Sequence, residues 1–264
     1  MKKIHFTNSN AFTLAEVLVT LGIIGIVAAL TMPTLIENHR KQVLRTQVKK
    51  SFSMISQAYG QAVSSLGYSP NCYYWENIES HHCVEYGDDN ECSKWVLDSS
   101  GKEIPAGLTG PREGCKQLAD ALERNLKIVK KCDDHAYSGG CIPEYKGVDT
   151  VVAGNNTDLS DADVTKQTTG CSGFRQNNIY NNSRVYVLAD GTIYGTYGAG
   201  GAYYGVPIFF MDVNGKKGPN KWGHDLFTFE LDGSLNSELH VAPGGCFIPE
   251  EGGTTAAAII SGND

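Results

Sequence analysis

The stretch that decides the fold is NAFTLAE (residues 10–16), which leads directly into an uncharged run from Val17 to Ile36. Lys2 and Lys3 precede it, and no small-x-small cleavage site follows, as a secretory signal peptide would require. A helix of this length spans the ~30 Å hydrocarbon core of a membrane. We therefore predict a membrane-spanning helix over residues 17–36, with a cleaved signal peptide and an ordinary single-span anchor as the alternatives.

Glu16 is the residue that an ordinary anchor leaves unexplained, because an unpaired carboxylate in lipid costs at least ~2.5 kcal/mol. With the residues before it, from Ala11 onward, it resembles the processing site of type IV prepilins and of the pseudopilins of type II secretion systems. The resemblance implies that a membrane peptidase cuts between Ala11 and Phe12 and methylates the new amino terminus of Phe12. Ala11 is a departure, since such proteins more often carry Gly there, but it is also a small residue.

The resemblance covers roughly residues 1–65 and implies roles for further positions. Glu16 would pair with the positive amino terminus of Phe12 on a neighbouring subunit and set the axial stagger of a filament, since buried charges persist when they are paired. A carboxylate that only lies in the headgroup region is the alternative. Gly25 and Pro33 stand where pilin helices commonly carry Gly and Pro, and Pro33 removes one backbone donor, so this segment can bend.

Beyond the apolar run the chain becomes polar but keeps a helical period. One apolar stripe is formed by Leu44, Val48, Phe52, Ile55, Tyr59, Ala62 and Leu66. Gly67 and Pro70 then end the pattern. A helix from Phe12 to Leu66 would be ~80 Å long, and we expect its second half to pack against a head domain. The stripe is too short to favour a coiled coil.

The remaining residues, 67–264, contain every cysteine of the chain, which predicts an exported, disulfide-rich head. These cysteines are Cys72, Cys83, Cys92, Cys115, Cys132, Cys141, Cys171 and Cys246. Short-range pairing candidates are Cys83 with Cys92 and Cys132 with Cys141, but connectivity cannot be deduced from sequence. Zinc binding is the alternative, which the lack of any Cys-x-x-Cys disfavours.

The location of the head rests on these cysteines. More basic residues follow the apolar run than precede it, which by the positive-inside rule would leave the head in the cytoplasm. Because disulfides need an oxidising compartment, the cysteines overrule this signal. We predict a single-pass protein of the bacterial inner membrane with its head in the periplasm or outside the cell, extracted into a surface filament on assembly.

Several segments of the head carry secondary-structure signals. Asp190-Gly191 between apolar runs predicts a hairpin, and further strands are expected over Val206–Val213 and Leu226–Leu231. We also expect a helix over Lys116–Val129, a polar surface excursion over Asp149–Lys166 and a mobile tail over Glu250–Asp264.

These elements make an α+β fold. We predict a cleaved leader (1–11), an N-terminal helix (12–66) with its membrane span at 17–36, and an extracytoplasmic globular head (67–264). The long transmembrane and stalk helix is expected to pack on a C-terminal antiparallel β-sheet. The resemblance to pilins implies the same arrangement.

The densest group of oxygen ligands in the sequence is a candidate calcium site formed by Asp212, Asn214, Asn220 and Asp225. The spacing departs from an EF-hand loop, but some major pseudopilins carry calcium in a loop near the C-terminus. The alternative is an Asn-Gly turn in which Asp and Asn side chains bond to their own backbone. No cofactor is otherwise required.

The sequence carries no P-loop, dinucleotide fingerprint or nucleophile elbow, so we expect no enzymatic activity. A formal net charge of −7 argues against a nucleic-acid partner. The resemblance implies a structural subunit of a type IV pilus or a secretion pseudopilus. Its partners would be copies of itself or other pilins and pseudopilins, the prepilin peptidase, an inner-membrane assembly platform and membrane lipid. The alternative is a membrane-tethered or filament-tip extracellular adhesion module.

Overall fold

The computed structural model describes residues 13–68, 70, 72, 75–76, 81–86, 92–97, 103–104, 114–167, 171–198, 206–233, 240–244 and 248–262. The chain forms two compact units, residues 1–43 and residues 44–264. The second half of the N-terminal helix therefore belongs to the head.

Helix α1 (Leu14–Leu66) begins at a capping box formed by Thr13 and Glu16. The backbone N–H of Thr13 donates to Glu16 Oε2 at 2.9 Å, and the backbone N–H of Glu16 donates to Thr13 Oγ1 at 3.2 Å. These two bonds satisfy backbone donors that a helix start leaves unpaired. Glu16 thus has a partner within its own chain.

The first half of α1 exposes large apolar side chains. Leu18, Ile24 and Leu30 are more than half exposed, at 62%, 62% and 73%. The helix is long and apolar enough to cross a membrane, and it continues through Pro33. This half has the composition of a membrane span and lacks the buried face of a soluble helix.

The second half of α1 buries the apolar stripe that the sequence predicts. Val48, Ile55 and Ala62 are fully buried, while Phe52 and Leu66 pack against the same core from its edge. Residues at steps of three and four lie on one face of a helix. The stripe therefore fixes which face of α1 meets the head.

The main sheet of the head is almost wholly antiparallel. Its strands run in the order β5 (Ile128–Cys132), β6 (Val185–Leu188), β7 (Ile193–Thr196), β8 (Ile208–Asp212) and β9 (Leu226–Gly233). Two more strands pair with β9, namely β10 (His240–Pro243) and, in parallel, β1 (Trp75–Glu76). The predicted hairpin is confirmed, since β6 and β7 join through the turn at Asp190 and Gly191 and pair Val187 with Ile193.

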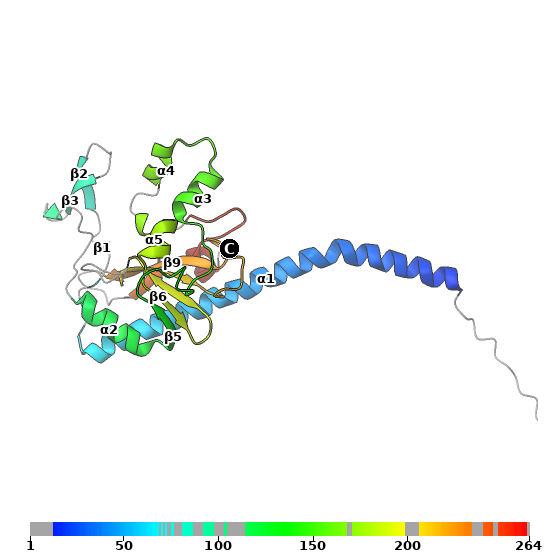
Figure 1. Ribbon diagram of the computed structural model, residues 1–264, viewed down its shortest axis with the longest axis horizontal. Helices are drawn as coiled ribbons and strands as arrows, with labels where there is room; N and C mark the ends of the chain where they lie inside the picture. The colour runs from blue at the N-terminus through cyan, green and yellow to red at the C-terminus, as the bar shows by residue number, and fades with distance from the viewer. Residues whose placement is uncertain are drawn as a thin grey trace, which may run out of the picture. The chain divides into compact units, whose positions relative to one another are not determined.

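Side chains alternate between the two faces of this sheet, as the twofold period of a strand requires. Tyr194, Phe209 and Phe229 lie in a core with α1, α2 (Cys115–Asn125) and α6 (Ala256–Ser261). Ile193 and Phe210 lie in a second core with α3 (Val148–Asn155), η1 (Ser172–Phe174) and α5 (Gln176–Asn181). Figure 1 shows α2 and the second half of α1 on one side of the sheet and α3, α4 (Asp161–Gln167) and α5 on the other. The head is therefore a sheet between two helical layers, an α+β fold of pilin-like type.

The helix predicted over Lys116–Val129 is shorter than expected. It ends at Asn125, because Leu126 takes an extended conformation while its N–H still bonds to Leu122 O. The chain then enters β5, where Val129 is 66% exposed. Pairing with β6 overrides the helical period at this end, so Val129 does not lie on the buried face of α2.

The excursion predicted over Asp149–Lys166 is only partly a surface segment. Val151 and Val152 of α3 are buried, whereas α4 (Asp161–Gln167) has no buried residues. Val148 and Val151 belong to the second core even though the segment around them is polar.

The prediction of a mobile tail over Glu250–Asp264 is wrong for most of that segment. Thr255 Oγ1 accepts the backbone N–H of Ala258 at 3.1 Å and caps α6. Ile259 is 2% exposed and lies in the same core as α1. A capping residue and a few apolar side chains suffice to order a Gly-rich terminus.

A separate three-stranded antiparallel sheet contains β2 (His81–Tyr86), β3 (Cys92–Leu97) and β4 (Glu103–Ile104). It lies within residues 81–104, a part of the head for which the sequence predicts no strand.

Candidate functional site

The loop between β8 and β9, residues 212–225, holds all four predicted calcium ligands. Asp212 is the last residue of β8, and Asp225 directly precedes β9. Both are fully buried, and the N–H of Val213 donates to the carbonyl of Asp225 at 2.9 Å. Antiparallel pairing therefore places the two carboxylates at the mouth of one hairpin.

Each carboxylate accepts hydrogen bonds from nearby donors. Asp212 accepts the hydroxyl of Tyr145 at 2.6 Å and the N–H of Asn214 at 3.2 Å. Asp225 accepts the N–H groups of Asn220 and Lys221 at 2.8 and 2.7 Å. The backbone-bonded turn, which the sequence left as the alternative to a metal site, is thus present in the loop.

The burial of the Asp212 and Asp225 carboxylates nevertheless favours a positive charge beside them. Burial raises the pKa of Asp212 well above its ordinary value, and the neighbouring charge of Asp225 raises it further. Burial also raises the pKa of Asp225, although the bonds from Lys221, Asn220 and the Asn214 side chain lower it in part. Two neighbouring buried carboxyl groups whose pKa values are both raised are stabilised either by a proton or by a bound cation.

Two amide oxygens in the loop support the cation. Asn214 Oδ1 and Asn220 Oδ1 are both buried without a hydrogen-bond partner. A buried oxygen without a partner loses its hydration and gains nothing in return. Calcium is bound by carboxylate, amide and carbonyl oxygens, so the residues present fit this ion. Among the described residues no three His, Cys, Asp or Glu side chains gather in one place, so a metal here would depend on the amide oxygens as well.

Three residues outside the loop hold it through hydrogen bonds, and the sequence did not indicate them: Tyr145, Lys146 and Glu250. Tyr145 binds Asp212, as described above. Trp222 is fully buried and donates its indole N–H to the carbonyl of Lys146 at 2.6 Å and its backbone N–H to Glu250 at 3.2 Å. These partners lie 28 to 76 residues from the loop residue that they contact. No local pattern could have indicated them.

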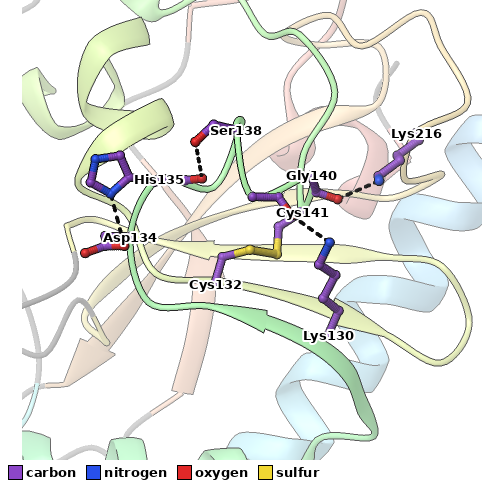
Figure 2. Close-up of a disulfide and its surroundings, with 9 residues drawn as sticks. Lys130, Cys132, Asp134, His135, Ser138, Gly140, Cys141 and Lys216 are labelled. Carbon is purple, nitrogen blue, oxygen red and sulfur yellow. Dashed lines mark hydrogen bonds and ion pairs between the residues drawn. A yellow bond between two sulfur atoms is a disulfide. The ribbon is translucent and has the colours of Figure 1, made fainter.

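The Cys132–Cys141 disulfide, one of the two pairings suggested by spacing, lies beside this loop (Figure 2). Lys130 Nζ donates to the carbonyl of Gly139 and Lys216 Nζ to the carbonyl of Gly140, each at 2.6 Å. Gly139 is closely surrounded, since a Cβ there would lie 3.0 Å from Cys132 Sγ. Lys216 belongs to the β8–β9 loop, so the disulfide segment and the loop are in direct contact.

Some of the remaining cysteines also form disulfides in the described part of the chain. A second disulfide joins Cys72 to Cys115, and both residues lie in the core on the α1 side of the sheet. Cys171 is also disulfide-bonded. The side chains of Cys83 and Cys92, and the whole of Cys246, lie outside the described part of the chain, so the suggested Cys83–Cys92 pairing stays a prediction.

The predicted processing site, Ala11 and Phe12, also lies outside the described residues. The structure begins at Thr13 and shows Glu16 in the capping box at the start of α1. Gly25 and Pro33 both lie within the exposed apolar half of the same helix, and a Cβ at Gly25 would meet nothing within 4 Å. This face is open to a close neighbour.

Comparison with known proteins assigns this N-terminal segment. Residues 6–32 match the family described as Prokaryotic N-terminal methylation motif. Comparisons with curated proteins and with solved structures gave no match. The chain therefore carries the prepilin-type cleavage and methylation signal of type IV pilins and pseudopilins, on a long apolar helix that leads into a pilin-like α+β head.

Proposed function

We propose that this chain is a structural subunit of a type IV pilus or of a type II secretion pseudopilus. In this proposal it is cut between Ala11 and Phe12, methylated on Phe12 and polymerised through α1. The observation that carries the proposal is the methylation motif leading into a helix half that exposes its apolar side chains all round. An apolar surface of this extent is stable in lipid or against other copies of the same helix.

Glu16 has two roles in this proposal. In the single chain it completes the capping box with Thr13. In the filament its charge pairs with the amino terminus of Phe12 of a neighbouring subunit and sets the axial register. The two roles are separable, because a glutamine also completes a capping box but carries no charge.

Intact mass of the membrane-extracted protein tests the processing step. We expect the mass to lack residues 1–11 and to carry one added methyl group. Recovery of the full unprocessed chain from a strain that holds an active prepilin peptidase would contradict the proposal.

We further propose that Asp212, Asn214, Asn220 and Asp225 hold a calcium ion. The ion would neutralise the two buried carboxylates and supply partners for the two buried amide oxygens. Anything that binds only the folded state stabilises it, by about 2.7 kcal/mol when the ligand stands at 100 times its Kd. Calcium should therefore raise the Tm of metal-depleted protein, and magnesium should raise it less, since it rarely occupies cages made only of protein ligands.

A further inference from the structure

Three hydrogen bonds join the β8–β9 loop to residues 140–146, a segment that includes Cys141 of the Cys132–Cys141 disulfide. Lys216 Nζ donates to Gly140 O, the Tyr145 hydroxyl to Asp212 Oδ2, and the Trp222 indole to Lys146 O, each at 2.6 Å. The partners of these three bonds outside the loop lie within residues 140–146. Residues 140–146 therefore position the loop together with residues 250–254, which bond to Trp222, Gly223 and His224.

The segment itself has little regular structure to hold it. Residues 141–147 belong to no helix or strand. Ile142 and Tyr145 are anchored in the core on the α3 side of the sheet. Its covalent tie to the sheet is the disulfide, which joins Cys141 to Cys132 on β5, where Cys132 pairs with Val185 of β6.

Tyr145 is the residue through which this tie reaches the carboxylates. It is fully buried, and its backbone is held by Tyr180, whose hydroxyl accepts the Tyr145 N–H at 3.1 Å. Its ring packs edge-on against Phe210 of β8, with the ring centroids 5.9 Å apart. The hydroxyl thus contacts Asp212 from a rigid base, and Figure 2 shows the disulfide and Lys216 converging on the start of the same segment.

We infer that the Cys132–Cys141 disulfide and Tyr145 are positioning elements for the Asp212 loop, so that breaking the disulfide or removing the hydroxyl weakens cation binding there. The inference rests on the proposed calcium site. Groups that hydrogen-bond to a metal's ligands change metal affinity by about 10- to 100-fold when they are removed. Tyr145 stands in this relation to Asp212, and the disulfide ties the segment that carries Tyr145 to β5.

Calorimetric titration of the metal-depleted full-length protein with CaCl₂, in detergent, tests the inference. We expect Tyr145→Phe to weaken calcium binding by about 10- to 100-fold, and the Cys132→Ser/Cys141→Ser double variant to weaken it in the same direction. Wild-type affinity in both would overturn the inference. Tyr145→Phe removes one hydroxyl and is the milder change, so it gives a result even where the disulfide variant folds poorly.

Two control variants lie on the opposite face of the sheet. Cys72→Ser/Cys115→Ser removes the Cys72–Cys115 disulfide, and Tyr59→Phe removes a buried hydroxyl that bonds to Tyr194 at 2.9 Å and to Val206 O at 3.0 Å. Both should lower the Tm and leave the calcium affinity unchanged. Equal weakening by the controls would mean that general destabilisation, and not positioning, sets the affinity.

Hydrogen exchange in the metal-free protein separates this inference from the calcium proposal. The backbone N–H of Asn214 donates to Asp212, so its exchange reports on that carboxylate directly. If the wild type binds no calcium, the calcium proposal fails, but this amide should still exchange faster in Tyr145→Phe than in Tyr59→Phe. Equal exchange in the two variants would overturn the positioning inference itself.

Discussion

The two halves of α1 belong to one helix and meet opposite environments. From Val17 to Ile36 the helix carries exposed apolar side chains on every face, whereas from Leu44 onward it buries one stripe and exposes polar residues elsewhere. A helix that is apolar all round needs an apolar surrounding, and a helix with one stripe needs one neighbour. The first half therefore needs apolar surroundings, and the second half packs on the head of its own chain.

The largest expected effect concerns Glu16, in the first half alone. Glu16→Gln keeps the capping box but removes the charge, so we expect normal membrane insertion, an unchanged head and no incorporation into filaments. Co-purification with sheared filaments, compared with the amount in the membrane fraction, measures this. Glu16→Ala should behave in the same way.

Normal assembly of Glu16→Gln would remove the register role and leave Glu16 with its capping role only. A failure of Thr13→Ala to assemble, with Glu16 intact, would point to the helix start and not to the charge as the requirement.

A matched pair of isoleucines tests the division of the helix. Ile55 is fully buried against the head and Ile24 is 62% exposed. Ile55→Ala should lower the free energy of unfolding of the head by about 2–5 kcal/mol, because it leaves a cavity in the core. Ile24→Ala should leave it unchanged. Denaturant unfolding in detergent, followed by tryptophan fluorescence, measures both, and equal effects would mean that the two halves do not differ as described.

The β8–β9 loop allows a prediction about the head alone. Asn220 has a positive φ of 55°, which a glycine adopts without strain. Asn220→Gly removes a buried oxygen without a partner, so the metal-free Tm should stay the same or rise. The increase in Tm on adding calcium should disappear. A variant that responds to calcium as the wild type does would exclude Asn220 as a ligand.

The smallest effect concerns the ion pair between the second half of α1 and the β6–β7 turn. Lys50 Nζ lies 2.9 Å from Asp190 Oδ2, and the N–H of Thr192 donates to Asp190 Oδ1. Burial raises the pKa of Asp190, but the bonds from Lys50 and Thr192 hold it below its ordinary value overall. The contribution of ionised Asp190 to the free energy of unfolding is therefore complete above the pKa of about 3.9 in the unfolded state. It is lost as the pH falls through the lower pKa of the folded state.

Lys50→Met should accordingly lower the free energy of unfolding by about 0.2–1 kcal/mol at pH 6. The difference from wild type should shrink when unfolding is repeated at successively lower pH. A difference that stays constant with pH would show that the lysine acts through its aliphatic packing.

The sequence predicted the elements that depend on local periodicity. The stripe from Leu44 to Leu66 and the hairpin at Asp190-Gly191 both lie where they were expected, because helix faces and tight turns are determined by nearby residues. The end of α2 was misplaced, since pairing of β5 with β6 is a tertiary contact. The packed tail depends in the same way on a core formed by distant elements.

The candidate site shows the same division. The four proposed calcium ligands lie within one loop and could be identified from the sequence, whereas Tyr145 and Glu250 reach the loop from distant segments. Their contacts follow from the fold and have no local signature. The Cys132–Cys141 pairing was suggested by short spacing, while Cys72 and Cys115 are 43 residues apart.

The start of α1 has an electrostatic consequence for the mature subunit. Thr13 caps the helix, so in the proposed processing a cationic amine is created on the preceding residue, beside the positive end of the helix macrodipole. A positive charge there is unfavourable by about 0.3–1 kcal/mol when exposed. Glu16 of the same chain already accepts the Thr13 N–H, so one carboxylate would have to cap the helix and neutralise the amine as well. A carboxylate supplied by a neighbouring subunit would neutralise the amine in place of Glu16. This interaction at the start of the helix would then favour growth of a filament.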